Sequence, residues 1–300
     1  MGSEIELPSG FKPISLEDYE IFNAYFSKFQ PEISEYTFTN LFMWRNYYQF
    51  QWIVHNNQLV MVSTNKSGVL TAFPPLGDNL SSSIEFLMDI SEKSKLKLEI
   101  HRAPKKIAEE IKKLGILCEI IQDRDNWDYI YARNDLVDLP GKPYANFRKK
   151  LNRFKRQFVW TYEQLDAHLI NLILAMQDEW CGIRACYDDD SLNEENLGIH
   201  EIFTHWKTLQ FDGGVIKVDG IIIAYTLAEI LNNDTIVIHV EKANPEYNGA
   251  YQAVAQQFCK NLDEKIIFIN REQDLGDPNL RKAKEHYHPV KYIEKYKIEF

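Results

Sequence analysis

The chain has 300 residues, of which 45% are hydrophobic and 26% are charged, a composition typical of a folded globular protein. Its 34 basic and 44 acidic residues give a net charge of −10, which argues against a general nucleic-acid coat and against sequence-specific DNA binding. No apolar run approaches the roughly 20 residues of a membrane helix, so no transmembrane segment is expected.

Residues 1–6 lack the basic and apolar segments of a secretory signal peptide. A helix is predicted from Ser15 to Lys28, because Asp18 follows Ser15 in a capping-box-like spacing and Pro31 stops the helix. Residues 35–47 are rich in aromatic side chains and are expected to form a short helix or loop that packs inward. The remaining first half predicts strands at 50–55, 58–64, 69–73, 96–101, 116–121 and 127–133, and helices at 81–94 and 104–114.

Residues 138–143 read Asp-Leu-Pro-Gly-Lys-Pro and are the predicted linker, which gives domains at 1–140 and 141–300. The second half predicts helices at 144–157, 163–180, 195–209, 248–262 and 278–286, and strands at 215–218, 221–229, 235–241, 265–270 and 290–298. Both halves contain a meander of three strands followed by alternating helices and strands. We therefore expect an α+β fold built by structural duplication.

The four cysteines, Cys118, Cys181, Cys186 and Cys259, do not make a disulfide scaffold, so free thiols and a cytoplasmic location are expected. His239 and Glu241 share one face of a strand and are interpreted as a polar pair in the core, although a functional hydrogen-bonded pair is the alternative. No set of residues shows the spacing of a zinc or calcium site, so no metal is predicted.

A basic segment follows the linker, in contrast to the acidic chain as a whole. It carries seven positive charges and no negative one, at Lys142, Arg148, Lys149, Lys150, Arg153, Lys155 and Arg156. Apolar residues at 147, 151, 154 and 158 give the predicted helix one apolar stripe and a basic outer face. Lys149 and Arg153 on that face are candidate contacts to tRNA, a phospholipid head group or a nucleotide. A face that only keeps the helix soluble is the alternative.

Two loops at strand ends are candidate sites. Gly249, between a strand and a helix, would let backbone N–H groups approach a phosphate, although an ordinary turn explains it too. Residues 270–276 follow a buried apolar strand, and polar groups at a strand's carboxyl end suit a ligand crevice. An exposed loop or a structural ion-pair network is the alternative there.

The second loop also carries a resemblance. Residues 270–276 (Asn-Arg-Glu-Gln-Asp-Leu-Gly), 280–284 (Leu-Arg-Lys-Ala-Lys) and 287–289 (Tyr-His-Pro), with Leu-Pro-Gly-Lys at 139–142, resemble a bacterial family similar to the C-terminal domain of phosphatidylglycerol lysyltransferases. The resemblance implies two GNAT-type acyltransferase domains in tandem, the first degenerate and the second with the site. Each would have a mixed, mostly antiparallel sheet flanked by helices. Related enzymes transfer an aminoacyl group from charged tRNA, or an acyl group from coenzyme A.

This resemblance implies that the protein is an acyl- or aminoacyltransferase that uses an activated donor and an amine or hydroxyl acceptor. The expected catalytic residues are Glu272, Asp274 and Asn270. The expected substrate-binding residues are Arg271, Gln273, Arg281, Lys284, Tyr287, Lys149 and Arg153. The expected partners are a charged tRNA and an anionic small molecule or lipid head group. A non-catalytic binding module with a decayed donor site is the alternative from another class.

Coenzyme A is disfavoured as the donor. Any phosphate would be held by Asn248, Gly249 and Ala250, but Glu246 stands where the GNAT pyrophosphate loop usually has Arg or Gln. A carboxylate about 4 Å from a phosphate costs on the order of 1 kcal/mol in water and more when desolvated. Tyr251 replaces the small residue that ends the loop. We therefore expect weak or absent acyl-CoA binding.

Overall fold

The structure is a computed structural model that describes residues 7–63 and 68–300, so residues 1–6, the basis of the signal-peptide prediction, lie outside the described part. The chain forms two compact units. Unit 1 comprises residues 1–128, 273–277 and 292–300, and unit 2 comprises residues 129–272 and 278–291. The units thus differ from the contiguous ranges 1–140 and 141–300, because the chain returns to unit 1 twice after the linker.

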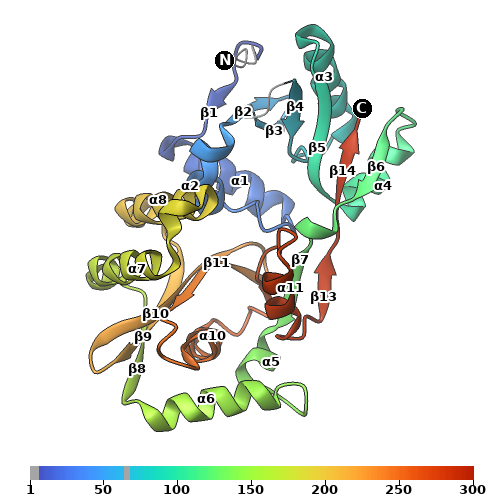
Figure 1. The fold of residues 1–300 in the computed structure, drawn as a ribbon. Coiled ribbons are helices and arrows are strands. Elements are labelled where there is room, and N and C mark those ends of the chain that lie inside the picture. Colours follow the sequence, from blue (N-terminus) through green and yellow to red (C-terminus); the bar gives the residue numbers. More distant parts are fainter. Residues whose placement is uncertain (1–6, 64–67) are drawn as a thin grey trace. The chain divides into compact units, whose positions relative to one another are not determined.

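Unit 1 is built around a seven-stranded sheet in the order β1-β2-β3-β4-β5-β14-β6 (Figure 1). Its elements are β1 Lys12–Pro13, α1 Tyr19–Phe29, α2 Phe38–Tyr48, β2 Phe50–His55, β3 Gln58–Ser63, β4 Val69–Ala72, α3 Leu80–Ser94, β5 Lys97–Pro104, α4 Lys105–Lys113, β6 Glu119–Gln122 and β14 Lys295–Glu299. Apolar residues of α3 and α4 pack on strands β3, β4 and β5 in one buried cluster. Helix α3 forms the crossover connection between the parallel strands β4 and β5, and its packing in this core fixes its position.

The second sheet has the order β13-β7-β12-β11-β10-β9-β8. The elements of this half are β7 Asp128–Ala132, α5 Arg133–Asp138, α6 Ala145–Gln157, β8 Trp160–Gln164, α7 Ile170–Arg184, α8 Asp190–Thr204, α9 Trp206–Leu209, β9 Asp212–Val218, β10 Ile221–Ile230, β11 Thr235–Ala243, α10 Ala250–Asn261, β12 Phe268–Asn270, α11 Pro278–Glu285 and β13 Lys291–Ile293. Helix α10 packs on β9, β10 and β11, and also contacts α6.

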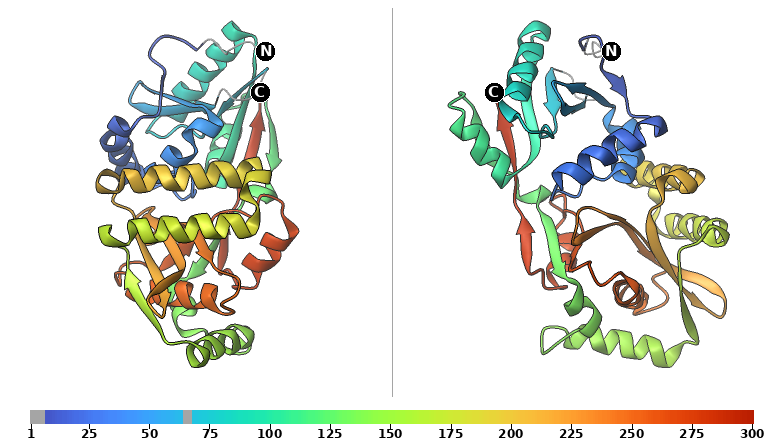
Figure 2. Two further views of the ribbon diagram at one scale, coloured as in Figure 1. Left: turned by 60° about the vertical axis from the view of Figure 1, so that its left-hand side comes forward. Right: turned by 180° about the vertical axis from the view of Figure 1, so that it is seen from behind.

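The two halves repeat one topology. In each, three antiparallel strands lead through a helix into a fourth strand that runs parallel to the third: β2-β3-β4-α3-β5 and β9-β10-β11-α10-β12. The duplication expected from the strand meanders is therefore confirmed. The final strands are exchanged, because the C-terminal β14 lies between β5 and β6, whereas β7 from the first half lies beside β12 (Figure 2).

Several local predictions need correction. Residues 290–298 form two strands that belong to different sheets, not one. Residues 160–164 form edge strand β8, whereas the sequence predicted a helix from residue 163 and no strand here. A disulfide joins Cys181 in the last turns of α7 to Cys186 just after the helix, so the expectation of free thiols was wrong for these two. None of the helices in the described ranges is both long and apolar enough to cross a membrane.

A buried charge network fixes the exchanged strand β14 in unit 1. The Lys295 ammonium is fully buried and donates to both carboxylate oxygens of Glu35 at 2.8 Å and to Asp128 Oδ1 at 2.6 Å. Arg102 adds a hydrogen bond to Glu35 at 2.9 Å, and Ser34 donates to Asp128 from its N–H and its hydroxyl. Burial alone would raise the pKa of Glu35, but Lys295 and Arg102 outweigh it and lower the pKa. The network therefore favours the ionised form of this carboxyl.

Candidate active site

The candidate site of unit 2 lies where the parallel strands β11 and β12 part. Their last pair is Val237 with Asn270, and β11 then continues through residue 243 without β12 beside it. The chain leaves β12 at Arg271, whose N–H donates to the Tyr129 carbonyl on β7. Crevices outside the carboxyl ends of parallel strands are the usual ligand positions in such sheets. Side chains of the β12 exit loop therefore meet those of β11 at a plausible ligand position.

An arginine–glutamate pair is at the centre of this site. Arg271 Nη2 lies 2.5 Å from Glu241 Oε1, and the two side chains are only 13% and 7% exposed. The guanidinium lies over the Tyr287 ring, 4.1 Å from its centroid. Within the described part of the chain, Arg271 Nη1 and Glu241 Oε2 are buried and have no hydrogen-bond partner. The pair thus keeps one donor and one acceptor whose hydrogen-bonding capacity is unused.

Burial and mutual attraction both shift the pKa values of the two groups of the pair. Burial raises the pKa of Glu241, and the attraction of Arg271 offsets only part of this effect. Burial would lower the pKa of Arg271, but the carboxylate beside it outweighs this effect and raises the pKa. Arg271 therefore keeps its charge, while Glu241 is a stronger base than an ordinary carboxylate.

A second buried charge cluster in unit 2 places a histidine between two carboxylates. His239 Nδ1 lies 2.7 Å from Glu272 Oε1, and its Nε2 lies 3.7 Å from Glu229 Oε2. The pairing of β10 with β11 skips His239, so it occupies a β-bulge, a device that redirects a side chain. Burial lowers the pKa of His239, but the hydrogen bonds and charges of the two carboxylates outweigh it and raise the pKa to about 9. The imidazolium form is therefore favoured at neutral pH.

Helix α11 supports Arg271 from its other side. The Lys284 ammonium donates to the Arg271 carbonyl oxygen at 2.6 Å, and the Tyr131 hydroxyl donates to the Lys284 carbonyl at 2.8 Å. Tyr287 follows the helix and underlies the guanidinium. The structure thus brings together Arg271, Lys284 and Tyr287 of the expected substrate-binding residues. Arg281 is half-buried on the same helix.

The expected catalytic residues are divided between the units. Asn270 is fully buried, and its Oδ1 accepts from the Glu272 N–H at 2.8 Å, which holds Glu272 in a left-handed conformation with φ 56°. Gln273 and Asp274 belong to unit 1, where Asp274 is buried and pairs with Arg124 at 3.1 Å. Both residues therefore belong to the other unit than Glu272, and the catalytic role of Asp274 and the substrate-binding role of Gln273 stay predictions.

Helix α6 packs closely against the loop that was expected to bind a phosphate. Asn248 is exposed, whereas Gly249 and Ala250 are buried. Gly249 has φ 103°, and a Cβ there would lie 2.7 Å from the Lys150 carbonyl oxygen of α6. The close packing of α6 against α10 therefore explains why a glycine is needed at position 249, whether or not a phosphate binds there.

Helix α6 has the expected apolar and basic faces. Phe147, Leu151 and Phe154 are buried, while Lys149 and Arg153 are exposed. Arg148 differs from these two, since it is half-buried and donates to the carbonyls of residues 139 and 141 in the linker. Arg148 thus holds the linker against α6 by hydrogen bonds. Lys149 and Arg153 remain exposed and could contact a polyanion.

The sequence of residues 26–299 matches the family described as phosphatidylglycerol lysyltransferase, C-terminal. The chain belongs to this family. The chain is also similar to a protein of known structure, a conserved protein of unknown function from Bacteroides thetaiotaomicron, with 30% identity and a TM-score of 0.91 over 98% of this chain and 100% of that one. No curated protein matches the chain.

More distant structures share the fold. L-PGS from Bacillus licheniformis is 16% identical with a TM-score of 0.68, over 97% of this chain and 93% of its own. FemX is 10% identical with a TM-score of 0.59, over 96% of each chain. The expected α+β class, with two GNAT-like sheets in tandem, is confirmed by the repeated topology and this likeness.

Sequence reasoning missed part of this candidate site. The alternation along β11 predicted that His239 and Glu241 share one face as a polar pair, but the bulge at His239 interrupts the alternation, and the two side chains pair with different residues, Glu272 and Arg271. Glu229 and Tyr131 gave no signal, because their proximity depends on the register of β10 and on the exchange of β7.

Proposed function

We propose that this chain transfers an aminoacyl group from a charged tRNA to a hydroxyl or amine, with phosphatidylglycerol as the first acceptor to test. The observation that carries the proposal is the buried Arg271–Glu241 pair, in which one donor atom and one acceptor atom have no hydrogen-bond partner within the described residues. The family description supports a lysyl group and a lipid acceptor. The raised pKa of Glu241 supports a role as base.

The proposed reaction is attack on the ester that joins the amino acid to the tRNA. Arg271 Nη1 donates to the ester carbonyl oxygen and stabilises the negative charge that develops there. Glu241 Oε2 accepts the proton of the attacking hydroxyl or amine. The new bond forms at the carbonyl carbon, the bond to the ribose oxygen breaks, and that oxygen takes the proton from Glu241. Lys284 and Tyr287 position Arg271 for this step.

Two features favour tRNA over coenzyme A as the donor. Lys149 and Arg153 on the exposed face of α6 supply charge for the phosphates of a polynucleotide. A glutamate at position 246 adds repulsion to any pyrophosphate at the loop.

The donor is tested by fluorescence titration of the full chain. The ligands are acetyl-CoA, uncharged tRNA, and tRNA that carries lysine through a stable amide. We expect the lysyl-tRNA amide to bind more tightly than uncharged tRNA, and acetyl-CoA to bind weakly or not at all. Arg271→Gln should remove the preference for the charged form, while Lys112→Gln, an exposed change on α4, should keep it. Micromolar binding of acetyl-CoA without a preference for charged tRNA contradicts the proposal.

A further inference from the structure

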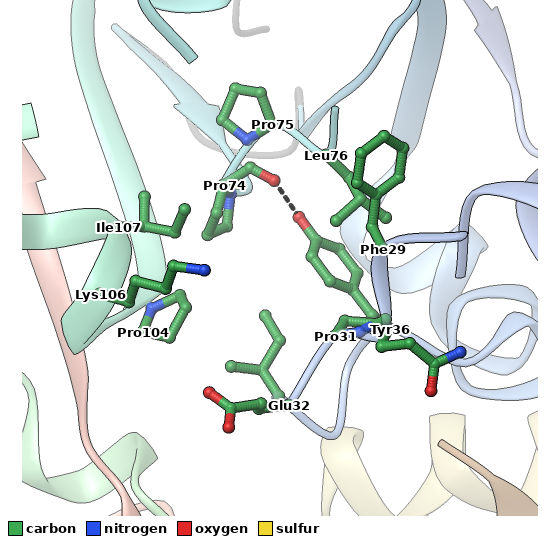
Figure 3. A pocket seen from close by; sticks show the side chains of 12 residues that line it. Phe29, Pro31, Glu32, Tyr36, Pro74, Pro75, Leu76, Pro104, Lys106 and Ile107 are labelled. Atoms are coloured by element: carbon green, nitrogen blue, oxygen red, sulfur yellow. Dashed lines mark hydrogen bonds between the residues drawn. The ribbon is translucent and has the colours of Figure 1, made fainter. Parts of the chain in front are cut away.

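A separate pocket lies in unit 1, beyond the carboxyl ends of the parallel strands β4 and β5 (Figure 3). Its volume is about 310 Å³. Phe29 and Tyr36 form one wall, Pro74 follows β4, and Ile107 comes from the first turn of α4. Known ligand pockets begin near this size, so a small molecule fits better than a large cofactor.

The walls of the pocket have little free hydrogen-bonding capacity. The Tyr36 hydroxyl donates to the Pro74 carbonyl, so only its ring faces the pocket. The Gln30 amide donates to the Ser27 carbonyl at 2.7 Å. Most other lining residues are proline or aliphatic. The body of a ligand in this pocket must therefore be apolar.

Two opposite charges stand at the pocket without partners. Lys106 and Glu32 line it and are exposed, and within the described ranges neither has a hydrogen bond or an ion pair. Figure 3 shows the Lys106 ammonium directed into the space below Pro74, with the Glu32 carboxylate at the lower edge. Lys106 also lies in the first turn of α4, where the helix dipole favours an anion.

We propose that this pocket binds a free apolar α-amino acid. Lys106 binds its carboxylate, Glu32 binds its ammonium group, and the proline and aromatic walls cover its side chain. The apolar walls exclude a lysine side chain, whose ammonium would find no partner among them. This site belongs to unit 1 and does not depend on the transfer reaction proposed for unit 2.

Isothermal titration of the full chain tests the proposal with L-leucine and L-phenylalanine as probes. We expect one molecule to bind per chain, and L-leucinamide and N-acetyl-L-leucine, which each lack one charge, to bind about tenfold more weakly. L-lysine should not bind. No heat from leucine or phenylalanine at millimolar concentration would overturn the proposal, and so would hexanoate binding as tightly as leucine.

Variants test the location of the bound amino acid. Lys106→Ala and Glu32→Gln change exposed side chains and should each weaken leucine binding about tenfold. Lys113→Ala, on the same helix but outside the pocket, is the matched control and should bind like the wild type. Ile107→Trp should fill the pocket and abolish binding, with circular dichroism to verify the fold. Unchanged affinity in the Lys106 and Glu32 variants would refute this placement.

Discussion

The raised pKa of His239 predicts that unit 2 loses stability as the pH rises above neutrality. The pKa rises from 6.5 to about 9 on folding, so the folded form holds the proton more strongly. The stabilisation is fully present below pH 6.5 and is lost as the pH approaches 9. At 1.36 kcal/mol per pH unit, the loss over this window is about 3 kcal/mol. The side chain is only 1% exposed, so solvent screening reduces this figure little.

Urea unfolding between pH 6 and pH 9.5 measures this effect in the wild type and in His239→Gln. Other groups titrate in both proteins, so the difference between the two curves isolates His239. The free energy of unfolding of wild type minus that of the variant should fall by about 3 kcal/mol across this window. His168→Gln, which removes an exposed histidine with carboxylate neighbours, is the control and should follow the wild type. Parallel curves for wild type and His239→Gln, or an imidazole titration by NMR near pH 6.5, would refute the reasoning.

Three further outcomes follow from the packing. Lys295→Met should destabilise unit 1 by about 3–5 kcal/mol in thermal unfolding, because it removes the buried cation that Glu35 and Asp128 share, whereas Lys297→Met on the same strand should have little effect. Gly249→Ala should lower the melting temperature more than Gly220→Ala, since both have positive φ but only Gly249 faces a backbone oxygen; equal losses would contradict the packing argument. Arg153→Glu should weaken tRNA binding in filter assays and reduce its salt dependence, and an unchanged affinity would leave α6 as a merely solvated face.

Local signals predicted much of each unit. The turn at residues 219–220 and the apolar runs around it predicted the β9–β10 hairpin, because such a turn is encoded by neighbouring residues. The exchange of β7 and β14 could not be predicted, because strand pairing between distant segments leaves no local pattern. The same limit explains why residues 290–298 were predicted as one strand.

The site was predicted in part for a similar reason. The polar run after β12 indicated a crevice, and Arg271 and Glu272 do face the β11 side chains there. The same run continues into Asp274, which is buried in unit 1, since the chain leaves one unit within two residues. No local pattern in the sequence predicts that Lys295 is fully buried, because the carboxylates that compensate its charge are more than 160 residues away in the sequence.

The most direct test of the proposed function is a transfer assay with tRNA charged with radiolabelled lysine. Vesicles that contain phosphatidylglycerol serve as the acceptor, and the labelled lipid is measured after extraction. The account predicts label in the lipid with the wild type, about a hundredfold slower transfer with Glu241→Gln, and retained transfer with the control Glu246→Gln. If no label leaves the tRNA for the lipid or for any added amine, or if Glu241→Gln transfers at the wild-type rate, the central claim is wrong.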